Sequence, residues 1–418
     1  MRVSSLLALS VASVAALGAC GANPEPAAPP ADATGVLMAR QDARPAPSTM
    51  WKTRDVFNAF WSDVAGPGRL ASNLALTSAG ALVVTESPAP KVGAEGKVTL
   101  YPADLSVRIP GQRPAVISKA PKAATDTRQI IAASAGRSGL TWLETTSTSL
   151  AMQDWRIHYQ PADGQPRLVG DSDALYKTRE LPPPPGGIHP QASADGRIYW
   201  AAAAPDRTSV NGFTALILAA DTTGRTAPRP VVRNAKLPRV VGSTLYYVVS
   251  PDVAPGKLTG RFEIHALTAG VDKVIASGVL EKDQQLERLV AGPTHLAWYI
   301  GTANSQAEPS ADPDEGCADR SHDGCSIFVQ KLGSAEPPTR IAASSTGVEM
   351  SLDGSLLGWG SGSSNGDPGE YLLDLNNSKL WRLGDSRGCS SVSIAGSYIS
   401  WGKSDAAGRC GVTVAQRI

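Results

Sequence analysis

The chain has 418 residues, with 39 Lys and Arg against 38 Asp and Glu, so its formal net charge is +1. This balance argues against nucleic acid as a partner, because nucleic-acid binders carry a strongly basic field. Hydrophobic residues make up 42% of the chain and charged residues 18%, which predicts a buried core and excludes a disordered chain. Abundant glycine and proline without a collagen-like period are typical of turns in an all-β protein.

The first twenty residues predict export. Arg2 is followed by an apolar stretch, Leu6–Leu17, of signal-peptide length that is too short to span a bilayer as a mature helix. It ends in Leu17-Gly18-Ala19-Cys20, which resembles the bacterial lipobox, whose cysteine is acylated and becomes the new N-terminus. We expect residues 1–19 to be a lipoprotein signal peptide and Cys20 to carry the lipid. The alternative is an ordinary secretory signal with an incidental cysteine.

Residues 20–48 are rich in proline and alanine, a composition typical of an extended, semi-rigid tether. No later apolar run reaches about 18 residues, so no transmembrane helix is expected. The sequence therefore predicts a folded domain over 49–418 that is held by its lipid anchor on the outer, extracytoplasmic face of a bacterial membrane.

Four further cysteines agree with export. An even number in an exported chain predicts two disulfides, and we favour the local pairs Cys317–Cys325 and Cys389–Cys410 among the three possible connectivities. The alternative is a zinc site, for which the spacings are poor and no histidines cluster nearby.

A short pattern recurs seven times between Gly80 and Ser404: a small or turn residue, an apolar residue, any residue, and then Trp or a residue that replaces it. The aromatic position is spaced by 42 to 61 residues and is occupied by Val84, Trp142, Trp200, Tyr247, Trp298, Trp359 and Trp401. Each copy alternates with period two and is bounded by turn residues, which predicts a strand. A strand precedes each copy and one or two follow, beginning with Lys97–Tyr101 in the first unit. Seven such units predict an all-β, seven-bladed propeller of four-stranded antiparallel blades.

The last unit lacks a fourth strand at its C-terminal end. Such a gap would leave the backbone groups of a sheet edge unpaired. Alternating apolar residues at Met50–Phe60 predict that this N-terminal segment supplies the missing outer strand, with a possible short helical piece at Val56–Phe60.

The repeat resembles TolB-like and WD-type β-propellers over about residues 65–418. In TolB-like repeats a Ser-Pro-Asp-Gly turn leads into the strand that ends in the aromatic residue. The stretches Ser193–Gly196 and Ser351–Gly354 match this turn without the proline, and Ser393–Gly396 is a degenerate copy. The resemblance implies a propeller that binds envelope proteins or cell-wall components.

The innermost strands of a propeller converge on its axis, so the axial mouth is the expected ligand site. Three converging arginines there would suit a carboxylate, a phosphate or an acidic peptide. The alternative is that several of the polar side chains point between blades or cap strand ends. The residues predicted near the mouth are Arg128, His189, Arg239, Arg288 and Glu349.

Other candidate chemistry is weaker. Two Gly-x-Ser-x-Gly matches, at 362–366 and 384–388, lack the following helix and downstream histidine of a serine nucleophile. His158 and His265 occupy equivalent places in their repeats and are predicted to be half-exposed strand residues. An acidic insertion with Asp312, Asp314 and Glu315 is a weak calcium candidate that lacks EF-hand spacing, and its alternative is a solvated surface loop.

These observations favour a non-catalytic envelope lipoprotein that uses the propeller as a scaffold for a protein or cell-wall ligand, without a cofactor. The alternative is a propeller enzyme, a lyase or a glycan-active enzyme, that uses axial His and Arg residues. A cluster of histidines and carboxylates at the channel mouth would favour the enzyme.

Overall fold

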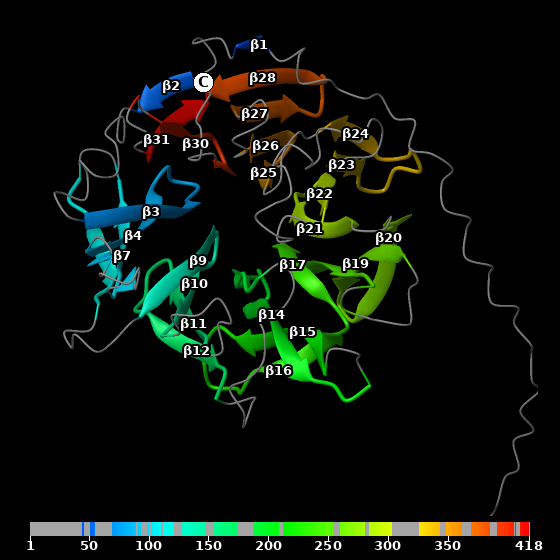
Figure 1. The fold of residues 1–418 in the computed structure, drawn as a ribbon, viewed down its shortest axis with the longest axis horizontal. Helices are drawn as coiled ribbons and strands as arrows, with labels where there is room; N and C mark the ends of the chain where they lie inside the picture. The colour runs from blue at the N-terminus through cyan, green and yellow to red at the C-terminus, as the bar shows by residue number, and fades with distance from the viewer. Residues whose placement is uncertain are drawn as a thin grey trace, which may run out of the picture.

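In the computed structural model, seven β-sheets stand side by side as the blades of a β-propeller, and Figure 1 shows them arranged as a ring. None of the described residues forms a helix, and so none provides an apolar helix long enough to cross a membrane. The structure describes residues 44–45, 51–54, 69–88, 91–92, 98–99, 102–109, 112–120, 128–146, 154–173, 187–208, 212–251, 253, 260–280, 284–302, 326–342, 348–361, 369–384, 391–404, 406 and 410–417.

The first six blades run from an innermost strand to an outer strand in chain order, and blade seven does so for three strands and takes its outer strand from the N-terminal segment; the neighbouring strands of these four are antiparallel in every blade. The innermost strands are β3 (Arg69–Leu76), β9 (Gln129–Gly136), β13 (Gln191–Ala192), β17 (Lys236–Val241), β21 (Gln284–Ala291), β25 (Glu349–Asp353) and β29 (Val392–Ala395). The second strands are β4 (Leu82–Pro88), β10 (Gly139–Thr145), β14 (Arg197–Pro205), β18 (Thr244–Val249), β22 (His295–Thr302), β26 (Leu356–Ser361) and β30 (Tyr398–Ser404).

The outer half of each blade has the same order. The third strands are β7 (Asp104–Arg108), β11 (Arg156–Pro161), β15 (Phe213–Asp221), β19 (Arg261–Thr268), β23 (Ser326–Lys331), β27 (Gly369–Asp374) and β31 (Cys410–Arg417). The outer strands are β8 (Ala115–Ser118), β12 (Arg167–Asp171), β16 (Arg229–Arg233), β20 (Val271–Val279), β24 (Thr339–Ala342), β28 (Lys379–Gly384) and β2 (Trp51–Arg54). The predicted seven-bladed architecture is therefore confirmed.

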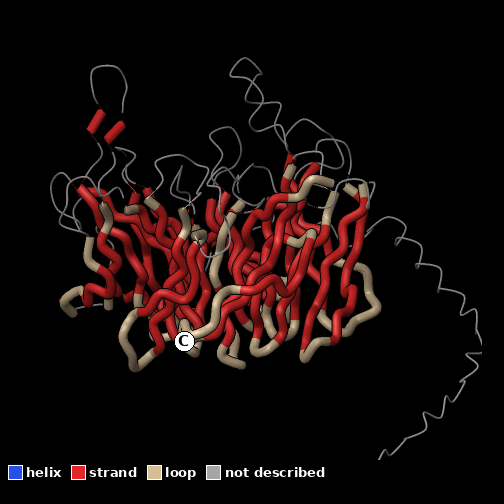
Figure 2. Tube along the Cα trace, turned by 90° about the horizontal axis from the view of Figure 1, so that it is seen from below, coloured by secondary structure: helices blue, strands red, loops and turns tan. Residues whose placement is uncertain are grey.

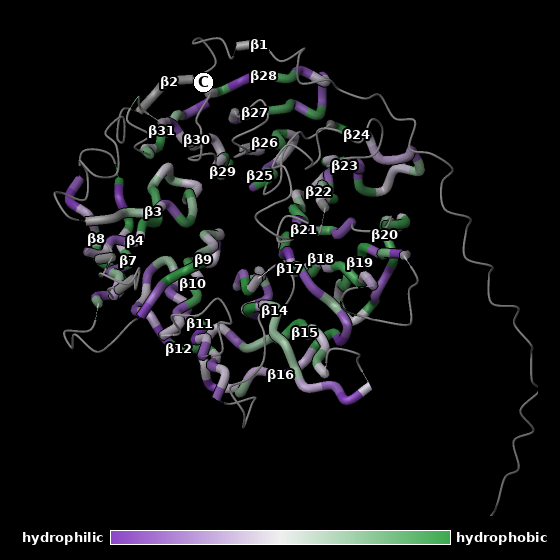
Figure 3. The backbone as a smooth tube through the Cα atoms, viewed as in Figure 1, coloured by the Kyte–Doolittle hydropathy of each residue, from purple (hydrophilic) through white to green (hydrophobic). Residues whose placement is uncertain are grey.

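The residue at the aromatic position of each repeat, which is Val84 in the first, fills the space between its own blade and the preceding one. Trp142 of blade two packs with Val83 and Leu105 of blade one, and Trp200 of blade three packs with Ile157 of blade two. Seven such clusters occur among the described residues, one at each contact between neighbouring blades. The two middle strands of a blade are therefore buried on both faces, as in β14 and β15, and Figure 3 shows much of these two strands in the green of hydrophobic residues.

The turn between the first and second strands uses glycine where the backbone needs a left-handed conformation. Gly196, Gly354 and Gly396 have φ values of 78°, 59° and 60°. A residue with a Cβ atom is strained at these angles, whereas glycine is not. These are the glycines of the three turns on which the resemblance to TolB-like repeats depends.

The N-terminal segment closes the ring, as predicted. Strand β2 pairs antiparallel with β31, with Trp51 opposite Arg417 and Arg54 opposite Val414. Strand β1 (Arg44–Pro45), from the predicted tether, adds a short parallel pairing to the outer edge of β28. Residues far apart in the chain thus complete blade seven and extend its neighbour, blade six (Figure 1).

One predicted strand of blade one was wrong. Val98–Thr99 (β6), inside the predicted strand Lys97–Tyr101, pairs with Lys91–Val92 (β5) in a separate two-stranded ribbon. The third strand of the blade is β7, in which Leu105 is fully buried, because the connection after β4 contains this ribbon and the chain returns to the blade only at Asp104. The possible helical piece at Val56–Phe60 lies outside the described residues.

Candidate functional site

A cavity of about 530 Å³ runs along the axis of the ring, and all seven innermost strands contribute to its lining. Four of the five residues predicted near the axial mouth line it: His189, Arg239, Arg288 and Glu349. They come from blades three to six, so the charged groups occupy one side of the channel. The side formed by blades seven, one and two is lined by apolar residues and by neutral polar residues, namely Asn73, Ser134, Ser391 and Ser393.

Irregularities in the innermost strands precede both channel arginines. The pairing of β17 with β18 shifts between Lys236 and Arg239, and Leu237 within this stretch has a φ of 54°. The pairing of β21 with β22 shifts between Leu286 and Arg288. A bulge changes the direction of the side chains that follow it. Burial of Leu237, which is 1% exposed, holds this strained backbone in place.

Arg288 and Glu349 form an ion pair across the contact between blades five and six. The Nη2 atom of Arg288 donates to Oε1 of Glu349 at 2.8 Å, and its Nη1 atom donates to the Glu287 carbonyl at 3.1 Å. Arg239 donates through Nε to the carbonyl of Leu289 and through Nη1 to that of Pro238. The carbonyl contacts leave the positive charge of Arg239 without a paired carboxylate among the described residues.

The surroundings of the channel shift the pKa values of the two arginines in opposite directions. The pKa of Arg239 is lowered to about 10, chiefly by burial and then by the like charge of Arg288, while Glu349 acts in the opposite direction. Burial would also lower the pKa of Arg288, but the charge and hydrogen bond of Glu349 raise it above its ordinary value. Both guanidinium groups are protonated at neutral pH, so with Glu349 the group carries a net charge of +1.

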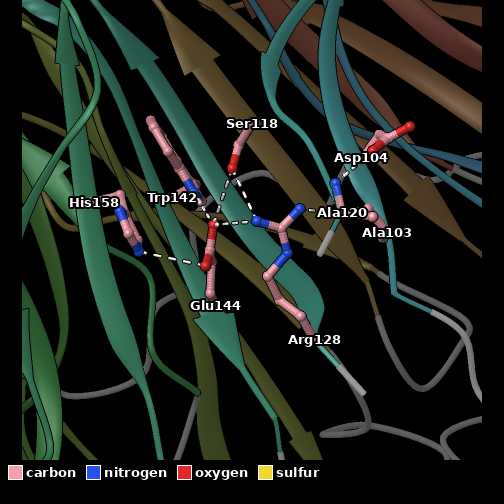
Figure 4. A network of polar contacts seen from close by, with 8 residues as sticks. All are labelled: Ala103, Asp104, Ser118, Ala120, Arg128, Trp142, Glu144 and His158. Atoms are coloured by element: carbon pink, nitrogen blue, oxygen red, sulfur yellow. Dashed lines mark hydrogen bonds and ion pairs between the residues drawn. The ribbon is translucent and has the colours of Figure 1, made fainter. Parts of the chain in front are cut away.

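Arg128 does not lie in the channel, which corrects the sequence prediction. Its side chain is buried between blades one and two, where Nη2 donates to the Ala103 carbonyl at 2.6 Å and Nη1 to Ser118 Oγ at 2.9 Å. Nη1 also lies 3.4 Å from Oε1 of Glu144 (Figure 4). The buried carboxylate of Glu144 draws the guanidinium into the blade contact, because a buried charge requires a partner.

Glu144 is the centre of this second network, shown in Figure 4. The indole Nε1 of Trp142 donates to its Oε1 at 2.9 Å, and Nε2 of His158 lies 3.4 Å from its Oε2. Burial alone would raise the pKa of Glu144, but His158, Trp142 and Arg128 together lower it to about 2. The carboxylate is therefore ionised, and it is held by these three side chains together with the Ser118 hydroxyl, which donates to Oε1 at 3.5 Å.

The two equivalent histidines are half-buried strand residues, as predicted. His158 stacks on Trp142 with a centroid distance of 5.2 Å, and His265 stacks on Tyr247 at 4.9 Å. The Nδ1 atom of His265 lies 3.2 Å from Asp272. Each histidine therefore continues the aromatic stack of its blade and contacts a carboxylate, away from the channel lining.

Sequence reasoning missed the neutral polar residues of the channel. Gln191 lines the cavity, and its Oε1 accepts a hydrogen bond of 2.7 Å from the backbone N–H of Val240. Asn73 precedes a register shift in β3 and lies at the channel as well. Both residues lie at bulges or strand ends, where the alternation of a regular strand is interrupted, so the sequence pattern could not identify them. Alternation does place Ser391 and Ser393 on the same face of their chain segment.

Several predicted sites lie outside the described residues. These are Cys20, the pair Cys317–Cys325, Cys389 and the calcium candidates Asp312, Asp314 and Glu315. Cys410 begins β31, and its pairing with Cys389 stays a prediction. Among the described residues, no group of three His, Cys, Asp or Glu side chains is placed to hold a metal ion.

Comparisons with known proteins find solved structures with a similar fold and no related sequence family. No protein-family model matches the chain. No curated sequence matches it either. Similar solved structures include puromycin hydrolase (13% identity, TM-score 0.46, 88% of this chain and 56% of that chain), oligogalacturonate lyase from Vibrio parahaemolyticus (10%, 0.45, 89% and 92%) and TolB from Acinetobacter baumannii (13%, 0.35, 85% and 82%). The chain thus spans a little over half of the puromycin hydrolase, and at these identities the similarity concerns the fold alone.

Proposed function

We propose that this protein is a non-catalytic binding propeller of the bacterial cell envelope that holds an anionic group of a protein or cell-wall ligand in its axial channel. The observation that carries the proposal is the placement of Arg239 and Arg288 on one channel with Glu349 as the carboxylate beside them. Arginine presents a planar fork of donors that matches a carboxylate or a phosphate.

The charge arrangement favours an anion over a cation or a neutral ligand. Arg288 already has Glu349 as its partner, whereas burial and the like charge of Arg288 lower the pKa of Arg239. An anionic group beside Arg239 would supply the missing counter-charge and relieve this repulsion. The neutral polar side of the channel would accommodate the remainder of such a ligand through hydrogen bonds.

Replacing Arg239 with glutamine is expected to weaken ligand retention by about tenfold or more, because a hydrogen bond to a charged group contributes about 1.5 to 3 kcal/mol. The measurement is the recovery of envelope proteins and cell-wall fragments on the immobilised protein, followed by calorimetry with the component recovered. Arg233→Gln, an exposed change of the same charge on β16, is the control and should bind as the unmodified chain does. Equal retention by both variants would contradict the axial site.

The alternative is an enzyme, because His189 and Glu349 are titratable groups on the same cavity and one of them could act as a base. A lyase or glycan-active enzyme would convert an acidic polysaccharide, whereas a binding protein would return it unchanged. Product analysis after incubation with polyuronates therefore separates the two functions.

The proposed location rests on the lipobox-like sequence at Cys20. Cys20→Ser is expected to move the protein from the membrane fraction to the soluble fraction of the bacterial envelope, because the acyl chains would have no acceptor thiol. The measurement is immunoblotting of separated fractions, with the exposed change Lys273→Gln as the control that leaves the anchor in place. Continued membrane association of the Cys20 variant would refute the lipid anchor.

A further inference from the structure

We propose that a second cleft, on the face of the ring where first strands turn into second strands, binds a small ligand through an oxyanion, a phosphate or carboxylate group. The cleft has a volume of about 680 Å³ and lies among blades five, six and seven. It shares no lining residue with the axial channel. Figure 2 shows the C-terminal end of the chain at this face. A volume of this size is typical of small-molecule sites.

Two cations without carboxylate partners define the cleft. Lys331 ends β23 and Arg417 ends β31, and both side chains are exposed. Within the part of the chain that the structure describes, neither forms an ion pair. Both cations line the same concave surface, so a bound anion would be attracted by both charges.

The carboxylate that lines the cleft is already engaged. Oδ2 of Asp353 accepts a hydrogen bond of 2.5 Å from the backbone N–H of Gly396, which ties blade six to blade seven. With Lys331 and Arg417 positive and Asp353 negative, the formal charge of the lining is +1 when His295 is neutral. The adjacent Gly354 leaves open space, since a Cβ atom there would meet no atom within 4 Å.

His295 adds a polar group whose protonation responds to an anion. The Thr294 hydroxyl lies 3.3 Å from the Gly354 carbonyl, to which it donates, and 2.9 Å from Nδ1 of His295. Because the Thr294 hydroxyl donates its hydrogen to the Gly354 carbonyl, Nδ1 of His295 donates to the Thr294 oxygen. The Nε2 atom of His295 is then the nitrogen that can gain a proton. Lys331 lies directly opposite His295 in the strand pairing.

Burial lowers the pKa of His295, and the charge of Lys331 lowers it further. The other charged groups that share a cavity with His295 are Arg417, which acts in the same direction, and Asp353 and Glu336, which oppose it. A bound anion would raise the pKa of His295. Anion binding should therefore take up a proton and strengthen as the pH falls through the titration range of His295.

The test is calorimetric titration of the full chain with sulfate, inorganic phosphate and acetate. Sulfate is the probe for pH dependence because its charge is constant between neutral and mildly acidic pH. Lys331→Gln and Arg417→Gln are each expected to weaken binding on the order of tenfold, because each removes a charge-assisted contact. Stronger binding of phosphate than acetate would indicate a phosphate ligand, and the reverse a carboxylate.

The control is Lys273→Gln, an exposed change of the same charge on β20, which should bind as the unmodified chain does. His295→Gln should remove the strengthening of sulfate binding at lower pH, and Arg239→Gln should leave the cleft unaffected. Thermal melting of every variant checks that the ring is intact. Absence of saturable binding by all three anions, or equal losses in the Lys331 and Lys273 variants, would overturn the proposal.

Discussion

Replacing Glu144 with alanine is expected to lower the free energy of unfolding by about 3 to 5 kcal/mol, because it removes the buried carboxylate that forms an ion pair with the buried charge of Arg128. The side chains of Arg128 and Glu144 are only 9% and 6% exposed. The change also removes the acceptor of the Trp142 indole and the carboxylate beside His158. Denaturant unfolding followed by circular dichroism measures the loss.

Glu263→Ala is the matched control. Glu263 is also a strand carboxylate beside an arginine and a histidine, at 3.4 Å from both Arg261 and His265. Its side chain is 24% exposed, so solvent screens its charge and the expected loss is below about 1 kcal/mol. Similar losses at Glu144 and Glu263 would show that the Glu144 network has no special role in stability.

The contribution of Glu144 also depends on pH. Its pKa in the folded chain is about 2, below the ordinary value of 4.5, because His158, Trp142 and Arg128 outweigh the effect of burial. A lowered carboxyl pKa stabilises the folded state above the ordinary value, and this stability is lost as the pH falls from about 4.5 to about 2. The stability difference between the unmodified chain and Glu144→Gln should therefore shrink over that range in acid titrations of unfolding.

Trp200→Ala is expected to cost about 3 to 5 kcal/mol, since removal of a buried indole loses apolar burial and leaves a cavity. Trp200 is fully buried between blades two and three and packs edge-on against Trp155 at 5.8 Å. Its indole N–H has no hydrogen-bond partner among the described residues, so the expected loss comes from packing alone. Thermal and denaturant unfolding measure the change.

Trp401→Ala tests the same repeat position in a less buried setting. Trp401 is only partly buried at the contact between blades six and seven, so its removal should cost about half as much or less. The comparison separates burial from repeat position, because both tryptophans occupy equivalent places in their second strands. An equal or larger loss at Trp401 would mean that the closing blade limits the stability of the ring.

Much of the fold could be predicted from local patterns. Each repeat position predicted to be aromatic lies at a contact between two blades, and the glycines of the three predicted turns lie between first and second strands. These features are predictable because period-two alternation and left-handed turns are local properties of the chain. In blade one, the strand after the repeat motif was predicted at Lys97–Tyr101, because this stretch has an apolar pattern like that of a strand. The strand of the blade is instead Asp104–Arg108. The candidate site was predictable only in part: four residues were placed at the channel, and Arg128 was not.

The number of repeats, the strand pattern of each and the N-terminal strand that completes the last one all follow from the order of the amino acids. Which charged side chains meet depends on how the blades pack. Register shifts before Arg239 and Arg288 lie where these residues reach the channel, and Glu144 retains Arg128 between two blades. The physical reason is that alternation fixes which residues share a face, whereas bulges and partners from neighbouring blades fix where a long charged side chain ends.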